Sequence, residues 1–422
     1  MAAGAVRPAP RRYMPDGPVP PSCPRHDQGR CMTDHPTGAS EPAILTPETR
    51  TALFYSTLFM GSALSAVYAG VWMAGRGLTP DQIGVVNAVP LFLMLVLNWL
   101  VGRVADKASD WRGVIVWSAW LAALAPLGFF AVEGFWGILL VWTLAGLPHM
   151  ASIPVLDAAA MRMTARRGSA FGALRAWGTI GYLVALAGAG WLMERLGQGA
   201  YVPLLAGFAA LKAVAAMGLP RFRAPGTNPD APGARHLREV LKPWFLLPLL
   251  GWAAVFATHL VINAFQGLLW QAQGIGLGTV GLLIAVGAAS ETAMFFVYRR
   301  LFRGVRARTL MLASAVLSAI RWALMAQAPG LPVLWFLQAL HGLTYGMGFL
   351  AGVQFIANWT SEDIAAEAQG FFVVLQQGMS VAAMAGFGLL MQHWGPGAHW
   401  GSAAFAALGA AAIWASWRLQ EP

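Results

Sequence analysis

The chain carries little charge. Asp, Glu, Lys and Arg make up only 11% of its 422 residues, less than half the roughly 25% that soluble domains carry. Hydrophobic residues make up 57%, and 19 residues are tryptophan. This composition excludes an ordinary soluble domain and favours a protein whose surface faces lipid.

Cysteine is also scarce. The two cysteines, Cys23 and Cys31, both precede the first apolar run, so the apolar part of the chain has no disulfide framework. With His26 and His35 they fit no common zinc-binding spacing, and we expect no metal site and no cofactor. Residues 1–44 lack the apolar core of a signal peptide, and their many prolines, arginines and small polar residues predict a disordered N-terminal tail.

Catalytic signatures are missing as well. The sequence has no G-x-x-x-x-G-K-[ST], no H-E-x-x-H and no G-x-S-x-G, the motifs of ATP-binding loops, of metalloproteases and of serine hydrolases. We therefore do not expect an enzyme. An intramembrane enzyme and a non-transporting sensor or assembly protein are the alternatives from other classes.

What the chain has in quantity is long apolar runs. A helical run of about 20 residues, at about 1.5 Å per residue, crosses the roughly 30 Å hydrocarbon core of a bilayer. Such runs recur from residue 51 to residue 417. They predict an all-α integral membrane protein with twelve transmembrane helices, at about 51–74, 82–105, 113–132, 134–161, 170–193, 200–219, 243–269, 277–301, 309–328, 331–359, 365–392 and 399–417.

The basic residues predict the orientation. The loops on one side of the predicted bundle hold sixteen Lys and Arg residues, and the loops on the other side hold only Arg76 and Arg195. Because cytoplasmic loops are enriched in Lys and Arg, we expect both termini in the cytoplasm, with the chain in a bacterial inner membrane. The formal net charge of +10 then reports topology, and we expect no nucleic-acid partner.

The only long polar stretch after the tail divides the spans six and six. We expect an N-terminal six-helix half at 45–219, a cytoplasmic linker at 220–242 and a C-terminal six-helix half at 243–422.

The two halves resemble each other in sequence. AGAGWLMERLG at 187–197 aligns with AGFGLLMQHWG at 385–395, and GLTPDQIG at 77–84 aligns with GIGLGTVG at 274–281. The offsets of 198 and 197 residues are nearly equal, which favours a duplication. A parallel repeat of two six-span halves is the layout of the major facilitator superfamily, whose solute site lies between the halves near mid-membrane.

The first inner loop, GRVADKASDWR, resembles the loop signature of that superfamily, G-x-x-x-D-R/K-x-G-R-R. Gly102, Asp106, Lys107 and Arg112 match the signature, and Ser109 replaces its second glycine. We expect these four residues to form a charge latch that breaks when the halves move. A solvated loop without a special role is the alternative.

Ionisable side chains inside the predicted spans indicate the functional site, because charged groups cost about 2.5–3.5 kcal/mol to insert there. Asp157 and Arg175 are centred on the basic turn at residue 166, so both lie about 13 Å from it on neighbouring helices. The same arithmetic places Glu291, Arg321 and His341 at one shared depth. A carboxylate keeps its charge while a cation neutralises it and takes up a proton when the cation leaves. These groups therefore predict proton coupling, with purely structural ion pairs as the alternative.

Other polar and aromatic residues accompany these charges. His259 and Asn263 are one helical turn apart and face one side, so we expect both to line the solute cavity. Trp177, Tyr182 and Trp322 lie deep in their spans, where they predict either stacking on a ring-shaped solute or plain packing.

Two further intramembrane residues have weaker functional signals. Lys212 is expected to extend its ammonium group to the inner surface. His149 follows Pro148, and we expect it to bond a carbonyl group that the proline leaves free.

Several motifs together resemble the phenylpropionate permease family of the major facilitators, and the likeness runs through most of 45–417. They are Asp157-Ala158, Arg175-x-Trp177-Gly178-Thr179, His259, Trp270-Gln271-Ala272, Glu291, Arg321-Trp322 and Leu340-His341. That family is similar to the oligosaccharide:proton symporters such as lactose permease. There an acid on helix 4 and an arginine on helix 5 bind sugar, and Asp157 and Arg175 match them. A helix 9 arginine and a helix 10 histidine match Arg321 and His341.

The chain also departs from those symporters. Their sugar-stacking tryptophan falls at Tyr182, and their helix 10 acid falls at Thr344. The resemblance therefore implies a solute other than a galactoside, with Glu291 as proton carrier beside Arg321 and His341. The residues that we expect to bind the solute are Asp157, Arg175, Tyr182, His259, Asn263 and Trp322.

We thus expect a secondary active transporter that takes up a small organic solute with protons by alternating access. The resemblance implies an aromatic carboxylate, such as a phenylpropionate-like compound. A drug or metabolite:proton antiporter on the same fold is the alternative. The expected partners are the solute, protons and the lipid bilayer, and because the fold needs no second subunit we expect a functional monomer.

Overall fold

The computed structural model describes residues 45–107, 110–222, 242–360 and 362–419, and the side chains of 98–107 and 362–367 are outside this description. The predicted tail and most of the predicted linker lie outside the described residues. Residues 45–422 group as one compact unit.

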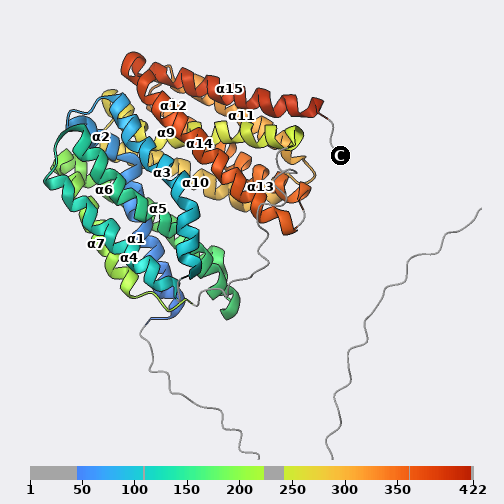
Figure 1. Cartoon of the computed structure of the whole chain (residues 1–422). Coiled ribbons are helices and arrows are strands. Elements are labelled where there is room, and N and C mark those ends of the chain that lie inside the picture. The colour runs from blue at the N-terminus through green and yellow to red at the C-terminus, as the bar shows by residue number, and fades with distance from the viewer. Residues whose placement is uncertain (1–44, 108–109, 223–241, 361, 420–422) are drawn as a thin grey trace, which may run out of the picture. The chain divides into compact units, whose positions relative to one another are not determined.

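The described residues form helices and no strands (Figure 1). The helices are α1 (Pro47–Val67), α2 (Ala69–Gly75), α3 (Pro80–Lys107), α4 (Trp111–Leu124), α5 (Gly134–Arg167), α6 (Phe171–Leu196), α7 (Tyr201–Met217), α9 (Pro243–Ala272), α10 (Leu277–Leu301), α11 (Ala307–Met325), α12 (Leu331–Ala339), α13 (Met347–Trp359), α14 (Glu362–Trp394) and α15 (His399–Ala415), and the π-helical turn η3 (Gly342–Gly346) joins α12 to α13.

The number of spans agrees with the sequence-based prediction. Within the described residues, ten stretches are long and apolar enough to cross a membrane, and α1 with α2, bent by 48°, makes an eleventh. One stretch, Ala368–Arg418, has 51 residues, far more than the roughly 20 that one crossing needs. It turns at Gly395–Ala398 between α14 and α15, which makes twelve. The expected all-α membrane fold is confirmed.

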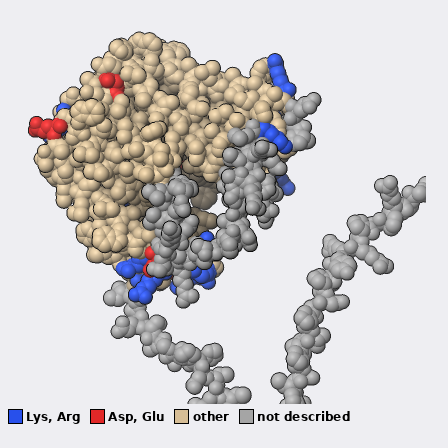
Figure 2. All heavy atoms as spheres, in the orientation of Figure 1, with Lys and Arg blue, Asp and Glu red and all other residues tan. Residues whose placement is uncertain are grey.

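The outer surface suits lipid. Trp136 is 77% exposed and Trp117 is 72% exposed, which would be costly in water but not in a bilayer. On the face drawn in Figure 2, Lys and Arg gather at the margins, and most of the described surface carries no charged residue.

A tight turn positions the first pair of intramembrane charges. α5 ends at Gly168, whose φ of +67° is a left-handed conformation that favours glycine. α6 begins at Phe171 and runs back antiparallel, so residues equally far from the turn lie at equal depth.

The halves meet through α6 with α10 and through α3 with α14. At the first contact a Cβ atom on Gly190 would stand 2.8 Å from the carbonyl oxygen of Leu277, and one on Gly281 would stand 2.7 Å from that of Leu186. Only glycine lets two backbones approach so closely.

The second contact repeats the first. A Cβ atom on Gly84 would stand 2.8 Å from the carbonyl oxygen of Met384, and one on Gly388 would stand 2.6 Å from that of Pro80. Each partner lies 197 or 198 residues from its counterpart in the other contact, the offsets of the sequence repeat. The repeated glycines therefore close one end of the molecule. Gly190 lies 22 residues, or about 33 Å of helix, beyond the basic turn at Gly168, so the closed end is opposite the basic loops.

Candidate functional site

A cavity of about 870 Å³ lies between the halves, where the repeat in the sequence predicts the solute site. Its N-terminal wall includes Phe59 of α1 together with Arg175 and Tyr182 of α6. Its C-terminal wall includes residues of α9, α10, α12, η3 and α13, among them His259, Asn263, Glu291, Gln338, His341 and Tyr345. This volume falls within the range of small-molecule sites, about 300–1,000 Å³.

The first predicted pair forms in the N-terminal half. Arg175 Nε lies 3.4 Å from Asp157 Oδ1, and each side chain is about one-third exposed. The hydroxyl of Tyr55 on α1 donates to the same Asp157 oxygen at 2.6 Å. The guanidinium of Arg175 also lies 4.2 Å from the ring centroid of Phe59, a cation–π contact. Arg175 thus lines the cavity, and the carboxylate of Asp157 neutralises its positive charge.

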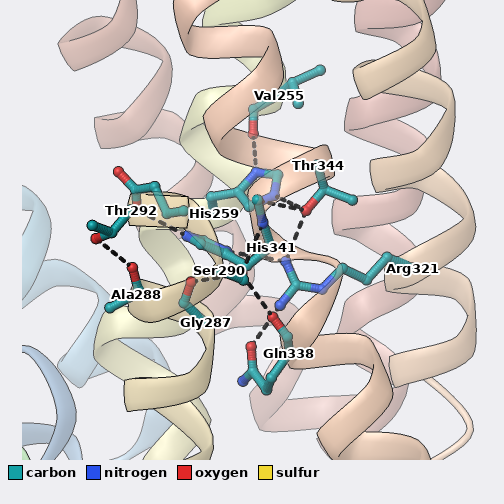
Figure 3. Close-up of polar contacts among 12 residues, drawn as sticks. Val255, His259, Gly287, Ala288, Ser290, Thr292, Arg321, Gln338, His341 and Thr344 are labelled. Atoms are coloured by element: carbon teal, nitrogen blue, oxygen red, sulfur yellow. Dashed lines mark hydrogen bonds and ion pairs between the residues drawn. The ribbon is translucent and has the colours of Figure 1, made fainter. Parts of the chain in front are cut away.

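The second predicted cluster forms in the C-terminal half (Figure 3). His341 links the other two members, because its Nδ1 lies 3.2 Å from Arg321 Nη1 and its Nε2 lies 3.4 Å from Glu291 Oε2. Arg321 is completely buried. Its Nη1 donates to Thr344 Oγ1 at 3.0 Å, and its Nη2 donates to Gln338 Oε1 at 2.6 Å.

The donors and acceptors assign the imidazole tautomers. Arginine can only donate, so His341 Nδ1 accepts, and the neutral imidazole carries its proton on Nε2, which lies 3.4 Å from Glu291 Oε2. His259 Nδ1 lies 2.9 Å from the carbonyl oxygen of Val255 and must donate to it. His259 Nε2 then accepts from the Thr344 hydroxyl at 3.1 Å. Both histidines act as neutral links beside a buried cation.

The aromatic lining is richer than the sequence indicates. The ring of Tyr345 stacks on His341 with centroids 5.1 Å apart, and Phe256 and Phe349 also line the cavity. Together with Phe59 they give an apolar cavity with a few convergent polar groups, the usual character of an organic-solute site.

Four of the six expected solute-binding residues line this cavity: Arg175, Tyr182, His259 and Asn263. Asp157 is not part of the lining and contacts Arg175 instead, and Trp322 is not part of the lining either. Its side chain is completely buried, donates its indole N–H to Thr258 Oγ1 at 2.9 Å and stacks on His399. It packs behind His259, with ring centroids 4.9 Å apart, so we correct the expectation that it contacts the solute. Trp177 is 51% exposed and is not part of the cavity lining.

Four residues that contact the two charge clusters were not predicted from the sequence as members of the site: Tyr55, Gln338, Thr344 and Tyr345. Gln338 and Thr344 each lie three residues from His341, a spacing that puts side chains on one helix face. This spacing from His341 could have indicated both residues as members of the site. Uncharged polar residues are so frequent, however, that the spacing alone does not distinguish them from others.

The expected latch is only partly described. Gly102, Asp106 and Lys107 belong to α3, which runs to Lys107, but the side chains of Asp106 and Lys107 are outside the described part of the chain. Arg112 Nη2 donates to the carbonyl oxygen of Met217 at 2.7 Å. This contact ties α4 to the end of α7 within the N-terminal half, and a latch between the halves stays a prediction.

Two weaker expectations are wrong. Lys212 does not reach the surface: it is 5% exposed, and its Nζ lies 3.3 Å from His149 Nδ1. His149 Nε2 lies 2.9 Å from Ser62 Oγ, so its ring bonds side chains instead of a free carbonyl.

Comparison with known proteins agrees with this architecture. A family model described as "MFS_1 like family" matches residues 49–400. The chain belongs to this family.

Two relatives of this chain, described next, carry the names of transporters. It is 27% identical over 362 residues to the probable 3-phenylpropionic acid transporter of Escherichia coli, covering 83% of this chain and 92% of the relative. It is 26% identical over 355 residues to the maltose permease of Geobacillus stearothermophilus, covering 82% and 88%.

Solved structures share the fold. The nucleoside transporter NupG superposes with a TM-score of 0.78 at 17% identity, covering 89% of this chain and all of that one. A bacterial homologue of the iron transporter ferroportin in an inward-facing state superposes with a TM-score of 0.69 at 13% identity, covering 89% and 99%. The MFS_1-like protein is therefore a multi-pass membrane transporter of the major facilitator type that acts on a small solute, and not an enzyme.

Proposed function

We propose that this protein takes up a small aromatic carboxylate together with protons, by alternating access across a bacterial inner membrane with both termini in the cytoplasm. The observation that carries the proposal is the chain of contacts from Glu291 through His341 to Arg321 beside the cavity. It joins a carboxylate that faces the solute space to a fully buried cation.

The cavity chemistry supports an aromatic acid. Phe59, Tyr182, Phe256 and Tyr345 supply ring faces to the central cavity, and the positive charge of Arg175 on its wall favours the entry of an anionic solute. The similarity to a probable 3-phenylpropionic acid transporter points to the same class of solute.

Coupling would follow from the charge of one carboxyl group. Ionised Glu291 lies 3.4 Å from His341 Nε2, and its attraction to the imidazole N–H and to the Arg321 cation behind it holds α10 against α12 and η3. A proton bound to Glu291 removes its charge and weakens that attraction, which frees α10 to repack. A carboxylate anion and one proton together carry no net charge, so the pH gradient drives their joint entry. Each pH unit supplies about 1.4 kcal/mol, which supports roughly tenfold accumulation.

The first prediction tests this coupling in proteoliposomes loaded at neutral pH. With an acidic outer buffer, the wild-type protein accumulates radiolabelled 3-phenylpropionate. Glu291→Gln abolishes that accumulation because the amide cannot carry a proton, but it retains exchange of internal for external solute.

The matched control is Glu133→Gln, since Glu133 is exposed and its side chain makes no capping hydrogen bond at the start of α5; it should transport like the wild type. Unimpaired proton-driven accumulation by Glu291→Gln would remove Glu291 from the mechanism. Extrusion of solute under the same gradient would identify an antiporter instead.

We also infer that one chain is sufficient for transport. The cavity and both charge clusters are built from a single copy. Reconstitution at one protein per vesicle should therefore retain full specific activity.

A further inference from the structure

A second cavity, of about 290 Å³, lies within the N-terminal half. It is lined by α1, α3, α4, α5 and α7, and residues of α9 and Met384 of α14 close one side. Ser62, Ala66, Leu260 and Asn263 line both this cavity and the central one. The second cavity therefore adjoins the solute space and does not form an isolated void.

A buried lysine marks this second cavity. Lys212 lines it and is 5% exposed. Within the described part of the chain its Nζ has one partner, His149 Nδ1 at 3.3 Å, and no acidic group pairs with it. A buried ammonium group without a counter-ion is costly. Arg175, in contrast, is already matched by Asp157.

The hydrogen bonds around Lys212 have a defined direction. The ammonium group can only donate, so His149 Nδ1 accepts, and the neutral imidazole carries its proton on Nε2. That N–H donates to Ser62 Oγ at 2.9 Å, and the Ser62 hydroxyl donates to the carbonyl oxygen of Leu58 at 3.2 Å. This chain uses one of the three N–H bonds of Lys212 and leaves two for a ligand.

The remaining walls suit the body of an organic acid. Pro90, Trp142, Leu205 and Phe208 present apolar surface to the cavity. A carboxylate is the simplest group that takes two N–H bonds and cancels one positive charge.

We propose that Lys212, oriented by His149, binds the carboxylate of the transported acid in this second cavity while the apolar part of the solute lies against the cavity wall. This inference rests on the proposed function for the identity of the solute. It names Lys212 as the anion-binding residue, and it requires no proton coupling.

The test is equilibrium binding to the purified full-length protein in lipid nanodiscs, with two probes of equal shape. The wild type should bind 3-phenylpropionate more tightly than its uncharged amide, 3-phenylpropionamide. Lys212→Met keeps the length and apolar stem of the side chain but removes the ammonium group. It should weaken carboxylate binding roughly 10- to 100-fold and leave amide binding within about twofold.

The matched control for charge is Lys242→Met, because Lys242 is exposed at the start of α9 and should change neither affinity. If Lys212→Met binds the carboxylate as tightly as the wild type, the proposal is wrong.

A second measurement locates the solute and does not depend on how Lys212→Met folds. In a protein whose Cys23 and Cys31 are replaced by serine, Ala145→Cys puts a thiol at the second cavity only, and Ala288→Cys puts one at the central cavity only. 3-Phenylpropionate should slow alkylation of Ala145→Cys at least several-fold, whereas 3-phenylpropionamide should protect it much less. Protection of Ala288→Cys alone would overturn the proposal.

These outcomes separate the two proposals. A wild type that binds carboxylates but shows no role for Lys212 contradicts only this inference. A wild type that binds neither probe contradicts the proposed solute class, and this inference with it. Loss of proton-driven uptake in Glu291→Gln has no bearing on either binding result.

Discussion

Arg321 is a charged residue that is completely buried inside the membrane-spanning bundle. Its guanidinium contacts His341, and His341 in turn contacts Glu291, so the carboxylate does not touch the guanidinium directly. The amide oxygen of Gln338 and the hydroxyl of Thr344 therefore act as substitutes for a counter-ion. Hydrogen bonds to a charged group contribute about 1.5–3 kcal/mol each, more than neutral ones.

Gln338→Leu should consequently destabilise the protein. The change keeps the volume nearly constant but removes the acceptor of Arg321 Nη2, which lies 2.6 Å away, and leaves that donor without a partner in a dry environment. We expect the midpoint of thermal unfolding in detergent to fall by several degrees.

The control for this variant is Gln327→Leu, because Gln327 is exposed between α11 and α12 and makes no such bond. An unchanged midpoint for Gln338→Leu would show that another group satisfies Arg321.

At the level of single residues, the sequence predicts how deep a side chain lies in the membrane better than the direction in which it points from its helix. Equal distances from a turn correctly brought Asp157 to Arg175 and His341 to Arg321, because the rise of a helix is fixed. Height alone does not give the angle around the helix axis. That is why Trp322, at the depth of Arg321, packs against His399 and not in the cavity.

At the scale of elements, the repeated glycines let the two halves approach each other closely at one end of the molecule. Backbone contacts such as Gly190 to Leu277 and Gly388 to Pro80 leave no room for a Cβ atom at either glycine. Alternating access requires such a contact, since one end of the cavity must open while the other closes.

Gly190→Ala combined with Gly388→Ala should hold this end open. Each added methyl group would stand 2.6–2.8 Å from a carbonyl oxygen of the opposite half. Overpacking of this kind costs roughly 1–3 kcal/mol, enough to shift a two-state equilibrium about 5- to 150-fold. Spin labels at Arg195 and Gln273, on opposite halves, should report a longer mean distance than in the labelled parent.

Gly188→Ala with Gly386→Ala provides the matched control. These glycines lie two residues earlier in the same helices, and an added Cβ on either has no neighbour within 4 Å. The label distance should stay unchanged. An equal change in both pairs of variants would show that helix propensity, and not the contact between halves, is responsible.

Hydropathy predicts where several of the helices begin and end, but it does not predict where a helix is interrupted. The apolar runs at 277–301 and 331–359 coincide with the bounds of α10 and of α12 to α13. The π-helical turn η3, directly after His341, has no hydropathy signature. Such turns often occur at functional sites, and this one places Thr344 and Tyr345 beside His341.

At the scale of the whole molecule, the cavity extends toward the basic loops. Phe171 and Gly172, at the start of α6, and Phe296, near the end of α10, belong to its lining, and the basic residues of both loops are adjacent to them in the chain. Since the opposite end is closed by glycine contacts, the structure corresponds to an inward-facing state if the basic loops are cytoplasmic, as positive-inside orientation predicts.

Accessibility of one cysteine tests orientation and state together. In a protein with Cys23 and Cys31 replaced by serine, Ala176→Cys puts a thiol in the central cavity. A membrane-impermeant maleimide should label it in inside-out vesicles and much less in right-side-out vesicles, whereas Gly199→Cys, in the loop at the closed end, should show the reverse. Adding Gly190→Ala and Gly388→Ala should raise labelling of Ala176→Cys from the outside, because opening the glycine contact exposes the same cavity to the other side.

Strong outside labelling of Ala176→Cys without those substitutions, with Gly199→Cys labelled from the inside, would reverse the predicted topology and require the proton gradient to act from the opposite side.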